Sequence, residues 1–578
     1  MPPAPPPSGT VRRAMTPPTP ASEVTDAPDV TDHAVPPAAS RGARHDVASA
    51  VAQVLGPDAH LRDAQEDALA SIADRDTLLV ARSGAGKTAV YAVATLVAGR
   101  LTVVVSPLVA LQRDQVRALE EAGLRAASVS SALTPRQQKD ALAAAAAGEL
   151  DVVLLAPEQL QKERVLEVLE GADVGLVVVD EAHCLSEWGH DFRPDYLLLA
   201  PAVQRMGSPR VLALTATASP RVREEISERL GMSDPYVLVH DADRPNIWLG
   251  ARPTAEADDR DRAVVEEVLA SQGAGIVYAR TRSHVEALAE VLEREGRPAL
   301  VYHAGLSAKR RSEVQDAFLG GDADLVVATS AFGMGVDRLD VRWVVHAGPP
   351  PSLDAYYQEV GRAGRDEEPA RAIVVHRPDD YGLNHYLRGG AGPKPATLRA
   401  VLKALPAADA EPVDRPALVE ASGLTDRTAG RALTVLLQVD AARAEGAGYV
   451  RTDERGVEAV LRAVAEHHER AAELERSRVE LVRTYTDTTD CRRRLLLELL
   501  GEEHPHPCGR CDSCDRGTSV EVTEDARVHP GQQVEHDEFG TGSVTVVEED
   551  RMTVLFDEHG YVTLDTRLAL DSGVLRVA

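Results

Sequence analysis

Cysteine, lysine and aromatic residues are scarce in this chain of 578 residues, and it contains no long hydrophobic run. Five cysteines are too few for a disulfide framework, and four of them cluster between Cys491 and Cys514, which indicates a metal site before disulfides. No segment approaches about 18 uninterrupted apolar residues, so we expect no membrane span. The N-terminus, MPPAPPPSGT, lacks the apolar stretch of a secretory signal, which predicts a cytoplasmic protein.

Basic charge is also in deficit, since 63 Lys and Arg residues stand against 91 Asp and Glu residues, for a net charge of -28. A uniformly acidic protein would bind nucleic acid poorly, because phosphate contacts need Lys and Arg. A chain of this length holds about four domains, however, and a local basic groove can lie on an acidic body. Arg outnumbers Lys by 57 to 6, which together with abundant Ala is typical of a GC-rich bacterial genome.

Composition changes along the chain in a way that indicates several domains. Between about 47 and 390, strand-length apolar runs such as VVLLA and LVVAT alternate with longer helical segments, which predicts an α/β fold with buried parallel sheets. A polar break near 241–262 indicates two lobes. The predicted domains are a disordered Pro-rich tail (1–45), two α/β lobes (46–243 and 244–390), a winged-helix-like module (391–456), a Cys-rich subdomain (457–516), a linker (517–526) and a small β-barrel (527–578).

A Gly-rich segment, ARSGAGKT at 81–88, lies between a predicted strand and a predicted helix. The backbone N–H groups of such a loop cradle phosphates. In this reading Lys87 reaches the β and γ phosphates of ATP, and Thr88 ligates Mg²⁺. The alternative, an ordinary surface loop, leaves the agreement of strand, glycines, Lys-Thr pair and helix unexplained. The predicted cofactor-binding residues of the loop are Ser83, Gly84, Ala85, Gly86, Lys87 and Thr88.

Two further segments would complete a nucleotide-hydrolysing site. The strand VGLVVV is followed by Asp180, a candidate Mg²⁺ ligand, and by Glu181, a candidate to polarise the attacking water. The alternative is a helix start capped by acids. In the second lobe, GRAGRD places Arg362 and Arg365 where they can reach a γ-phosphate across a cleft, unless they form a solvated basic turn.

Six motifs follow one another along the two predicted lobes: SPLVALQRDQV (106–116), DEAHCLSEWGHDFRPDY (180–196), LTATA (214–218), VYHAGL (301–306), VATSAFGMGVD (327–337) and YYQEVGRAGRD (356–366). These motifs and their order resemble the RecQ type of superfamily 2 helicases. The resemblance covers about 47–390 and 457–516, and it implies two RecA-like lobes. It also implies an ATP-dependent enzyme that moves 3′ to 5′ on single-stranded DNA and unwinds tailed duplexes in DNA repair or recombination.

The same resemblance implies roles for residues around the nucleotide. Gln65 with Arg62 would recognise adenine, and Gln358 would sense the γ-phosphate. Arg365 would be the arginine finger, with Arg362 beside it. The sequence departs from the family near Gln65, where no aromatic residue stands to stack on adenine, so nucleotide selectivity stays open.

The resemblance also implies a link between the ATP site and DNA, through Thr215 and Thr217. The phosphate loop departs mildly from the family pattern. Ser83, Ala85 and Thr88 stand where the family usually has Thr, Gly and Ser.

The segment CLSEWGHDFRPDY is rich in aromatic residues in a chain with eight Phe and Trp residues in all. In RecQ helicases this loop couples DNA contact to ATP hydrolysis. Trp188, His190, Phe192 and Arg193 could stack on bases and report to the neighbouring Glu181. The alternative is a core aromatic pair, which the polar residues between the two aromatics disfavour.

The cysteine cluster has the spacing of a zinc site. Cys491 is followed by sixteen residues and then by Cys508, Cys511 and Cys514, with two residues between each cysteine and the next. Four thiolates close a tetrahedral Zn²⁺ site without an open position for catalysis. The cluster and the preceding CRRRLLLELLGE resemble the RecQ zinc subdomain. The alternative is a set of free thiols.

The C-terminal part departs from the usual RecQ order, because the winged-helix-like pattern precedes the zinc cluster and the strand-separating hairpin cannot be assigned. The segment VEHDEFGTGSVTVVEEDRMTVLFDEHGYVTLD resembles the Tudor-like module of UvrD/PcrA-type helicases, which suggests RNA polymerase as a partner. Residues 515–578 hold 14 acids and 5 bases, so a protein partner is favoured over DNA. For this module, the alternative is a packing cap on the zinc subdomain. For the whole protein, the alternatives are a translocase with weak unwinding, an RNA helicase, and an adaptor without enzymatic activity.

Overall fold

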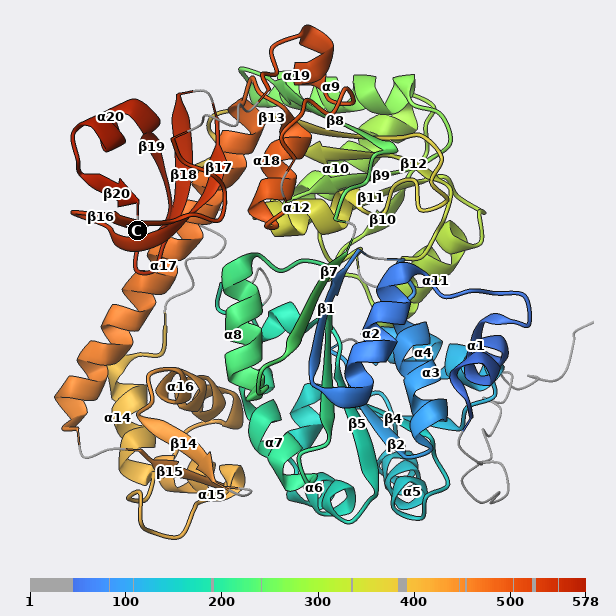
Figure 1. Ribbon diagram of the computed structural model, residues 1–578, viewed down its shortest axis with the longest axis vertical. Helices are drawn as coiled ribbons and strands as arrows, with labels where there is room; N and C mark the ends of the chain where they lie inside the picture. Colours follow the sequence, from blue (N-terminus) through green and yellow to red (C-terminus); the bar gives the residue numbers. More distant parts are fainter. Residues whose placement is uncertain are drawn as a thin grey trace, which may run out of the picture. The chain divides into compact units, whose positions relative to one another are not determined.

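The computed structural model describes residues 45–82, 84–107, 109–188, 192–240, 242–333, 336–382, 392–445, 448–452, 455–502, 504–521, 527–548 and 550–577. The predicted tail up to residue 44 and the second half of the predicted linker lie outside these residues. Within the described part, no helix is both long and apolar enough to cross a membrane. The predicted α/β class with two parallel-sheet lobes is confirmed (Figure 1).

Lobe 1 is a parallel sheet of seven strands in the order β3-β4-β2-β5-β6-β1-β7. The strands are β1 (Thr77–Ala81), β2 (Leu101–Val105), β3 (Ala126–Val129), β4 (Val152–Leu155), β5 (Val174–Val179), β6 (Arg210–Thr215) and β7 (Tyr236–His240). The helices are α1 (Val47–Leu55), α2 (Asp63–Asp74), α3 (Lys87–Ala98), α4 (Val109–Glu121), α5 (Pro135–Ala146), α6 (Glu163–Glu170), α7 (Leu199–Arg205) and α8 (Pro220–Leu230), with the short 3-10 helices η1 (Pro157–Gln161), η2 (Ala182–Leu185) and η3 (Pro194–Leu198).

Both faces of the lobe 1 sheet are buried by helices of the same lobe. Along β1, Leu78 and Val80 join a core built with α5 to α8, whereas Leu79 and Ala81 join a second core built with α2 to α4. Successive residues of a strand point to opposite faces, so burial of both faces requires continuous apolar runs rather than alternation. This explains the strand-length apolar runs of the sequence.

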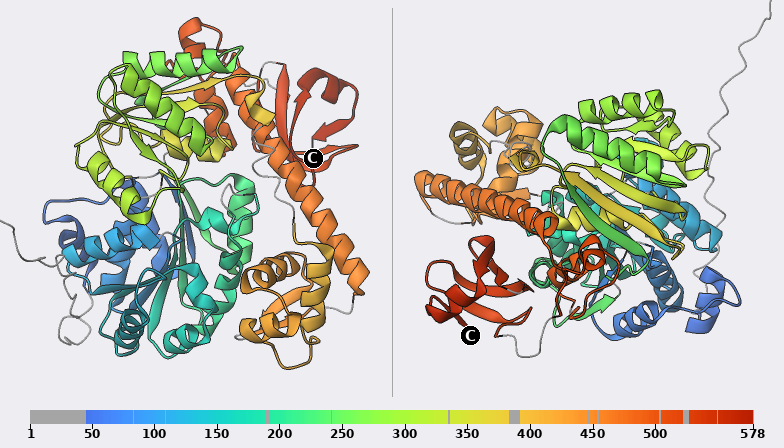
Figure 2. Two further views of the ribbon diagram at one scale, coloured as in Figure 1. Left: turned by 180° about the vertical axis from the view of Figure 1, so that it is seen from behind. Right: turned by 90° about the horizontal axis from the view of Figure 1, so that it is seen from above.

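Lobe 2 is a parallel sheet of six strands in the order β10-β11-β9-β12-β13-β8. The strands are β8 (Ile247–Pro253), β9 (Ala274–Ala279), β10 (Leu300–Tyr302), β11 (Leu325–Ala328), β12 (Val341–Ala347) and β13 (Ala370–His376). The helices are α9 (Ala257–Ala270), α10 (Arg282–Arg294), α11 (Ala308–Leu319) and α12 (Leu353–Val360). Figure 2 shows helices on both faces of each sheet from two further sides.

The two faces of the lobe 2 sheet are covered by different parts of the chain. Helices α9 and α10 bury one face. The other face packs against α11 and α12 and also against two helices of the Cys-rich subdomain, α17 (Val457–Asp487) and α18 (Arg492–Leu499). This subdomain also contains the short helix α19 (Asp512–Arg516). Lobe 2 and the Cys-rich subdomain therefore share one hydrophobic core.

Two smaller modules complete the described chain. The first has helices α14 (Pro395–Ala404), α15 (Arg415–Ser422) and α16 (Asp426–Gln438), followed by an antiparallel hairpin of β14 (Ala442–Glu445) and β15 (Gly448–Arg451) around its own core. This is the helix, helix, helix, wing order that the sequence predicts. The second, the C-terminal sheet, has antiparallel strands in the order β19-β18-β17-β16-β20. Its elements are β16 (Gln533–His536), β17 (Gly540–Val547), β18 (Arg551–Phe556), β19 (Gly560–Asp565), α20 (Thr566–Asp571) and β20 (Leu575–Val577).

Candidate active site and zinc site

The phosphate-binding loop lies where β1 leads into the N-terminus of α3. Gly84 and Gly86 have φ angles of 82° and 75°, which favour glycine, and a Cβ on Gly86 would lie 2.5 Å from the Gln65 side-chain nitrogen. The N-terminal N–H groups and the dipole of α3 favour an anion at this point. Thr88 lies half-buried in the first turn of α3, and Ser83 lies outside the described residues.

Lys87 begins α3, and its side chain turns back toward β1. Its Nζ donates hydrogen bonds to the carbonyl oxygens of Ala81 at 2.8 Å and Arg82 at 3.4 Å. Burial lowers the pKa of Lys87 below its ordinary value, while the carboxylates of Glu181 and Asp180 oppose this shift. The lysine and the acids, predicted from separate segments, therefore lie in one site.

Asp180 directly follows β5, at the same edge of the sheet as the loop after β1, because the strands are parallel and β6 alone separates them. Gln115 Nε2 and Ser106 Oγ donate to one carboxylate oxygen at 3.2 and 3.4 Å, and the Glu181 N–H donates to the other at 3.0 Å. Burial raises the pKa of Asp180 to about 6, with help from Glu181 and against the effect of Lys87. A carboxylate held in this way fits Mg²⁺, whose charge would replace the proton.

A polar chain leads from Glu181 to the segment after β6. Glu181 itself has a φ angle of 50°, in the left-handed region that residues other than glycine rarely adopt. His183 Nδ1 lies 3.4 Å from the Glu181 carboxylate and 3.0 Å from the Thr215 hydroxyl, which in turn donates to the Thr217 carbonyl at 2.9 Å. The threonines predicted to link ATP and DNA are thus connected to Glu181. His183 was not predicted from the sequence, although its place two residues after Glu181 is a usable signal.

Arg362 and Arg365 lie in the turn that follows α12. Arg365 pairs with Asp337, and burial together with Arg362 lowers the pKa of Arg365. Arg365 also helps to lower the pKa of Lys87, so these two cations of different lobes lie near each other. The turn is held by the buried Arg244, which was not predicted from the sequence. Its guanidinium donates hydrogen bonds to three carbonyl oxygens of the turn, those of Gly361 at 3.1 Å, Ala363 at 2.7 Å and Gly364 at 2.8 Å.

The residues predicted to recognise adenine contact the phosphate loop directly. Gln65 Nε2 donates to the Gly86 carbonyl at 3.0 Å, and Arg62 Nη1 donates to the Gly84 carbonyl at 3.1 Å. The Arg62 N–H donates to Gln65 Oε1 at 2.9 Å, which closes the N-terminus of α2. Gln358 lies half-buried on α12 in lobe 2. The adenine and γ-phosphate roles of these residues stay predictions.

The aromatic residues of the segment after η2 lie against arginines of α8. The Arg221 guanidinium lies 5.9 Å from the Trp188 ring, and the Arg229 guanidinium lies 5.7 Å from the Phe192 ring. Both aromatics are half-buried, and Trp188 packs against the lobe 1 core. Their stacking on DNA bases stays a prediction. The two other predicted residues of this segment are Arg193, which donates to the Pro107 carbonyl at 3.2 Å, and His190, which lies outside the described residues.

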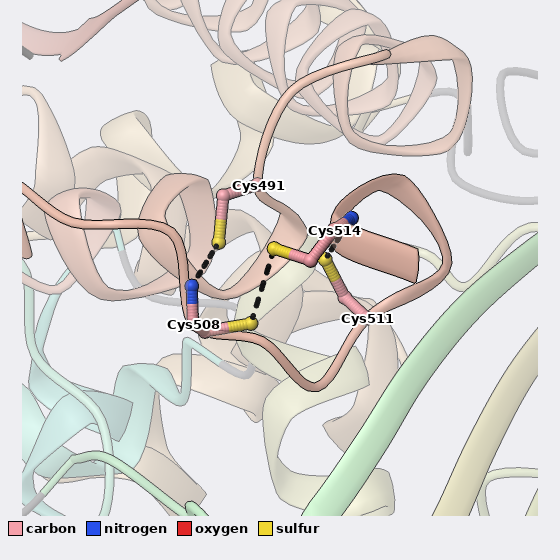
Figure 3. A group of neighbouring side chains, drawn as sticks. All are labelled: Cys491, Cys508, Cys511 and Cys514. Carbon is pink, nitrogen blue, oxygen red and sulfur yellow. Dashed lines mark hydrogen bonds between the residues drawn. The ribbon is translucent and has the colours of Figure 1, made fainter. Parts of the chain in front are cut away.

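The four cysteines predicted to bind zinc come together at the start of α18 and around α19. Their Sγ atoms all lie within 4.8 Å of one another, and the sulfur atoms face a common point (Figure 3). The Cys508 and Cys514 sulfurs are 3.8 Å apart, which matches the edge of a tetrahedron with Zn–S bonds of about 2.3 Å. Backbone N–H groups donate to the sulfurs of Cys491, Cys508 and Cys511 at 3.3 to 3.4 Å, which favours thiolates. These residues fit a structural Zn²⁺ site.

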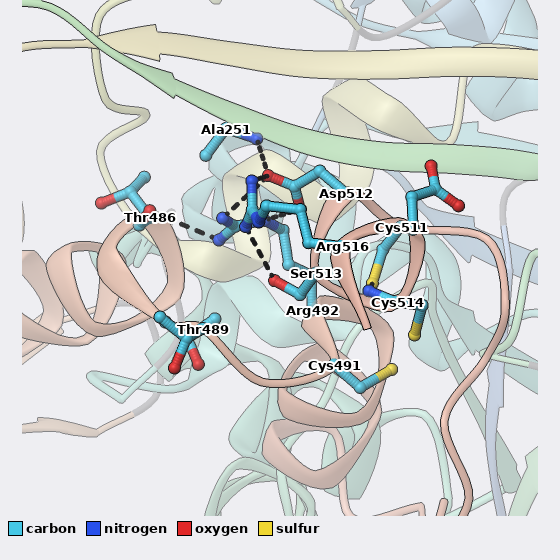
Figure 4. Close-up of polar contacts among 12 residues, drawn as sticks. Ala251, Thr486, Thr489, Cys491, Arg492, Cys511, Asp512, Ser513, Cys514 and Arg516 are labelled. Atoms are coloured by element: carbon cyan, nitrogen blue, oxygen red, sulfur yellow. Dashed lines mark hydrogen bonds and ion pairs between the residues drawn. The ribbon is translucent and has the colours of Figure 1, made fainter. Parts of the chain in front are cut away.

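The zinc ligands are joined to the edge strand of lobe 2. Leu249 of β8 forms a parallel bridge with Cys511. The buried Arg492 pairs with Asp512, Nε to Oδ1 at 2.5 Å, and Asp512 also accepts a hydrogen bond from the Ala251 N–H at 3.3 Å (Figure 4). Zinc would therefore order residues that also pair with lobe 2.

Three protein families match successive parts of the chain. The DEAD/DEAH box helicase family matches residues 62–226, and the helicase conserved C-terminal domain matches 260–367. The RecQ zinc-binding family matches 452–515, which contains all four cysteines. Each match falls on a part of the structure described above: lobe 1, lobe 2 and the Cys-rich subdomain.

Curated relatives agree with these families. The chain is 38% identical over 326 residues to the ATP-dependent DNA helicase RecQ of Pasteurella multocida, covering 56% of this chain and 51% of that protein. It is 29% identical over 489 residues to the protein of the same name from Bacillus subtilis, covering 84% of this chain and 69% of that protein. The chain thus spans about half the length of the first of these relatives.

A solved structure with a similar fold is the DUF1998 helicase MrfA bound to DNA, with a TM-score of 0.50, 19% identity, and coverage of 72% of this chain and 60% of that one. This likeness concerns the fold alone. The matched families, the relatives and the four-cysteine cluster agree with one another. In its two lobes and its Cys-rich subdomain, the chain is similar to RecQ-type superfamily 2 helicases.

Proposed function

We propose that the protein is an ATP-dependent DNA helicase that couples ATP hydrolysis to 3′ to 5′ movement on single-stranded DNA and to duplex unwinding, in DNA repair or recombination. One observation carries the proposal. The phosphate loop of lobe 1 meets the arginine turn of lobe 2, since Arg82 pairs with Glu367, two residues after Arg365, at 3.3 Å. Such a two-sided site can hold a triphosphate and release it when the lobes move apart.

Each group then has a role in hydrolysis. Lys87 neutralises the β and γ phosphates. Thr88 and Asp180 would hold Mg²⁺, which would supply positive charge against the charge that develops on the phosphates. Glu181 orients the attacking water, and Arg365 stabilises the charge spread over the transferring phosphoryl group. Gln358 senses the γ-phosphate, and Arg362 lies beside the finger Arg365. Gln65 with Arg62 recognises adenine, which their hydrogen bonds to the phosphate loop support.

DNA as the substrate is supported by the names of the relatives, which are DNA helicases. It is also supported by the half-buried aromatics Trp188 and Phe192, since aromatic rings beside arginines provide stacking surfaces for single-stranded bases. The zinc site would supply folding energy and leave hydrolysis to lobes 1 and 2. A bacterial protein of this kind would act on nucleoid DNA.

ATP hydrolysis measured with no nucleic acid, with single-stranded DNA and with single-stranded RNA tests the proposal, with Lys87→Ala beside each. We expect strong stimulation by DNA, weak stimulation by RNA, and loss of hydrolysis in the variant. Absence of hydrolysis under all conditions would overturn the enzymatic assignment. Equal or stronger stimulation by RNA would favour an RNA helicase.

Unwinding of a tailed duplex separates a helicase from a translocase that strips proteins from single strands. The second reading is favoured by one observation, since the winged-helix-like module precedes the zinc ligands and contacts lobe 1, where Arg415 lies 3.4 Å from Gln161. Duplexes with a 3′ or a 5′ tail would show the direction of movement. Unwinding of the 3′-tailed duplex alone supports the helicase reading.

We also propose that the C-terminal sheet (527–577) binds a protein, with RNA polymerase as the candidate that the Tudor-like resemblance suggests. Its excess of acids over bases disfavours DNA. Purified bacterial RNA polymerase should bind the full chain and should not bind a chain ending at residue 521. Equal binding of the two chains would remove this role.

A further inference from the structure

Glu187 directly precedes Trp188 in the aromatic-rich segment, and its side chain is contacted by residues of three helices. Its carboxylate accepts hydrogen bonds from Arg229 of α8 at 3.1 Å and from Gln438 of α16 at 3.4 Å. His467 of α17 lies 4.0 Å from the other carboxylate oxygen. Lobe 1, the winged-helix-like module and the long helix α17 therefore meet at one residue of the aromatic-rich segment.

The backbone of Glu187 is held as well. Arg478 of α17 donates from Nη2 to the Glu187 carbonyl at 2.9 Å, and its Nη1 pairs with Glu475 one turn earlier. Arg478 is 4% exposed. A buried guanidinium is costly unless its N–H groups are bonded, so this contact is strongly favoured over an unpaired arrangement.

The C-terminal sheet packs against α17 next to Arg478. Gly560 approaches α17 so closely that a Cβ there would lie 2.3 Å from the Ser477 hydroxyl. Tyr561, the next residue, lies near Arg478 and Ser219. Burial raises the pKa of Tyr561, whereas Arg478 and Ser219 act to lower it. Excluding water strengthens the hydrogen bond from Arg478 to Glu187.

The contact bears on the aromatic residues because they follow Glu187 directly. The Trp188 N–H donates to Ser186 Oγ at 3.0 Å, and Ser186 Oγ donates to Glu225 of α8. Fixing the peptide between Ser186 and Trp188 therefore fixes the start of the segment that leads to Phe192. A segment held in one arrangement needs less ordering when DNA binds.

We propose that Arg478 is a positioning residue for the aromatic-rich segment, and that its hydrogen bond to the Glu187 carbonyl sets how strongly DNA stimulates ATP hydrolysis. This inference rests on the proposed function. Arg478 acts through the backbone of Glu187 and touches neither nucleotide nor the acids that hydrolyse it. Its loss should change the coupling between DNA and hydrolysis and leave the basal rate alone.

Turnover without DNA and at saturating single-stranded DNA tests the proposal in four proteins: the wild type, Arg478→Ala, Arg478→Lys and Arg476→Ala. Arg476 lies on the same helix with its side chain 57% exposed, so it is a matched control. We expect Arg478→Ala to lose about tenfold in DNA stimulation, with basal turnover within about twofold of the wild type. Arg478→Lys should recover part of the loss, since it keeps one donor without the planar fork. Arg476→Ala should match the wild type.

Amide hydrogen exchange distinguishes positioning from general damage. In Arg478→Ala, exchange should rise at residues 186–188 and stay unchanged in β5, with bound zinc unchanged. Equal DNA stimulation in Arg478→Ala and Arg476→Ala would overturn the inference, as would a loss of zinc or a fall in basal turnover that accounts for the effect. If the wild type itself shows no stimulation by DNA, the proposed function fails, and this is visible without any variant.

Discussion

Lobe 1 and lobe 2 are built from the same kind of parallel sheet but complete their cores in different ways. Lobe 1 buries both faces of its sheet with its own helices. Lobe 2 does so on one face, and on the other it depends partly on α17 and α18, which lie beyond the winged-helix-like module in the sequence. Two similar sheets can therefore differ in how far they depend on other parts of the chain. Zinc bound by the four cysteines would stabilise lobe 2 as well as the Cys-rich subdomain.

Loss of zinc should have the largest effect on the difference between the two lobes. In Cys508→Ser we expect loss of the metal, whose binding contributes about 10–16 kcal/mol in small zinc domains, and unfolding of α18 and α19. Because α18 covers the lobe 2 sheet, amide exchange should rise in β8 and β13 and stay slow in β2 and β5. Cys184→Ala, which removes the fifth thiol from the lobe 1 core, should keep its zinc. Full protection of β13 without zinc would contradict the shared core.

A second comparison sets the lysine of lobe 1 against the arginine of lobe 2. Lys87→Ala and Arg365→Ala should each reduce turnover by about 10³-fold or more, since an arginine finger contributes that much to phosphoryl transfer. Binding of a labelled ATP analogue should fall strongly in Lys87→Ala and within a few-fold in Arg365→Ala. Arg371→Ala, which removes a lobe 2 arginine whose side chain is 44% exposed, should leave both quantities unchanged.

Cavities made in the two cores test the difference between the lobes directly. Leu166→Ala in α6 and Leu497→Ala in α18 each remove a buried leucine, which costs about 2–5 kcal/mol in unfolding free energy. Leu497→Ala should increase exchange in lobe 2 strands although Leu497 lies outside that lobe. Denaturant unfolding and amide exchange measure both effects. Leu568→Ala, at a residue that is 71% exposed, should stay within about 0.5 kcal/mol of the wild type.

Two buried aspartates should respond to substitution in opposite directions. Burial raises the pKa of Asp180 to about 6 from its ordinary value of 3.8, so the ionised form lowers stability above pH 6. Asp180→Asn should therefore raise the unfolding free energy at pH 7 by on the order of 2–3 kcal/mol, and the gain should vanish as the pH falls from about 6 to 4. Asp380→Asn in lobe 2 breaks an ion pair with Arg260 at 2.8 Å and should destabilise the protein. Thermal unfolding across this pH range checks both.

Much of the ATP site and the zinc site was accessible from the sequence, because their residues sit in short motifs next to strands and helix starts. In the loop at 81–88, in the acids after β5 and in the cluster of cysteines, the functional residues are close together in the sequence. Parallel strands end at one edge of a sheet, so such loops must meet there. The two-lobe α/β class, and the residues that meet at the ATP and zinc sites, could thus be predicted from the residues alone.

The contacts by which distant segments support these sites could be found only in the folded structure. Arg244 holds the turn at 361–364, α18 completes the lobe 2 core, and Arg478 holds the Glu187 carbonyl across 291 positions. An arginine that bonds backbone carbonyls has no partner that can be recognised by residue type, because every residue offers the same carbonyl group. Such contacts leave no periodicity or motif in the sequence, and they become visible when the chain is folded.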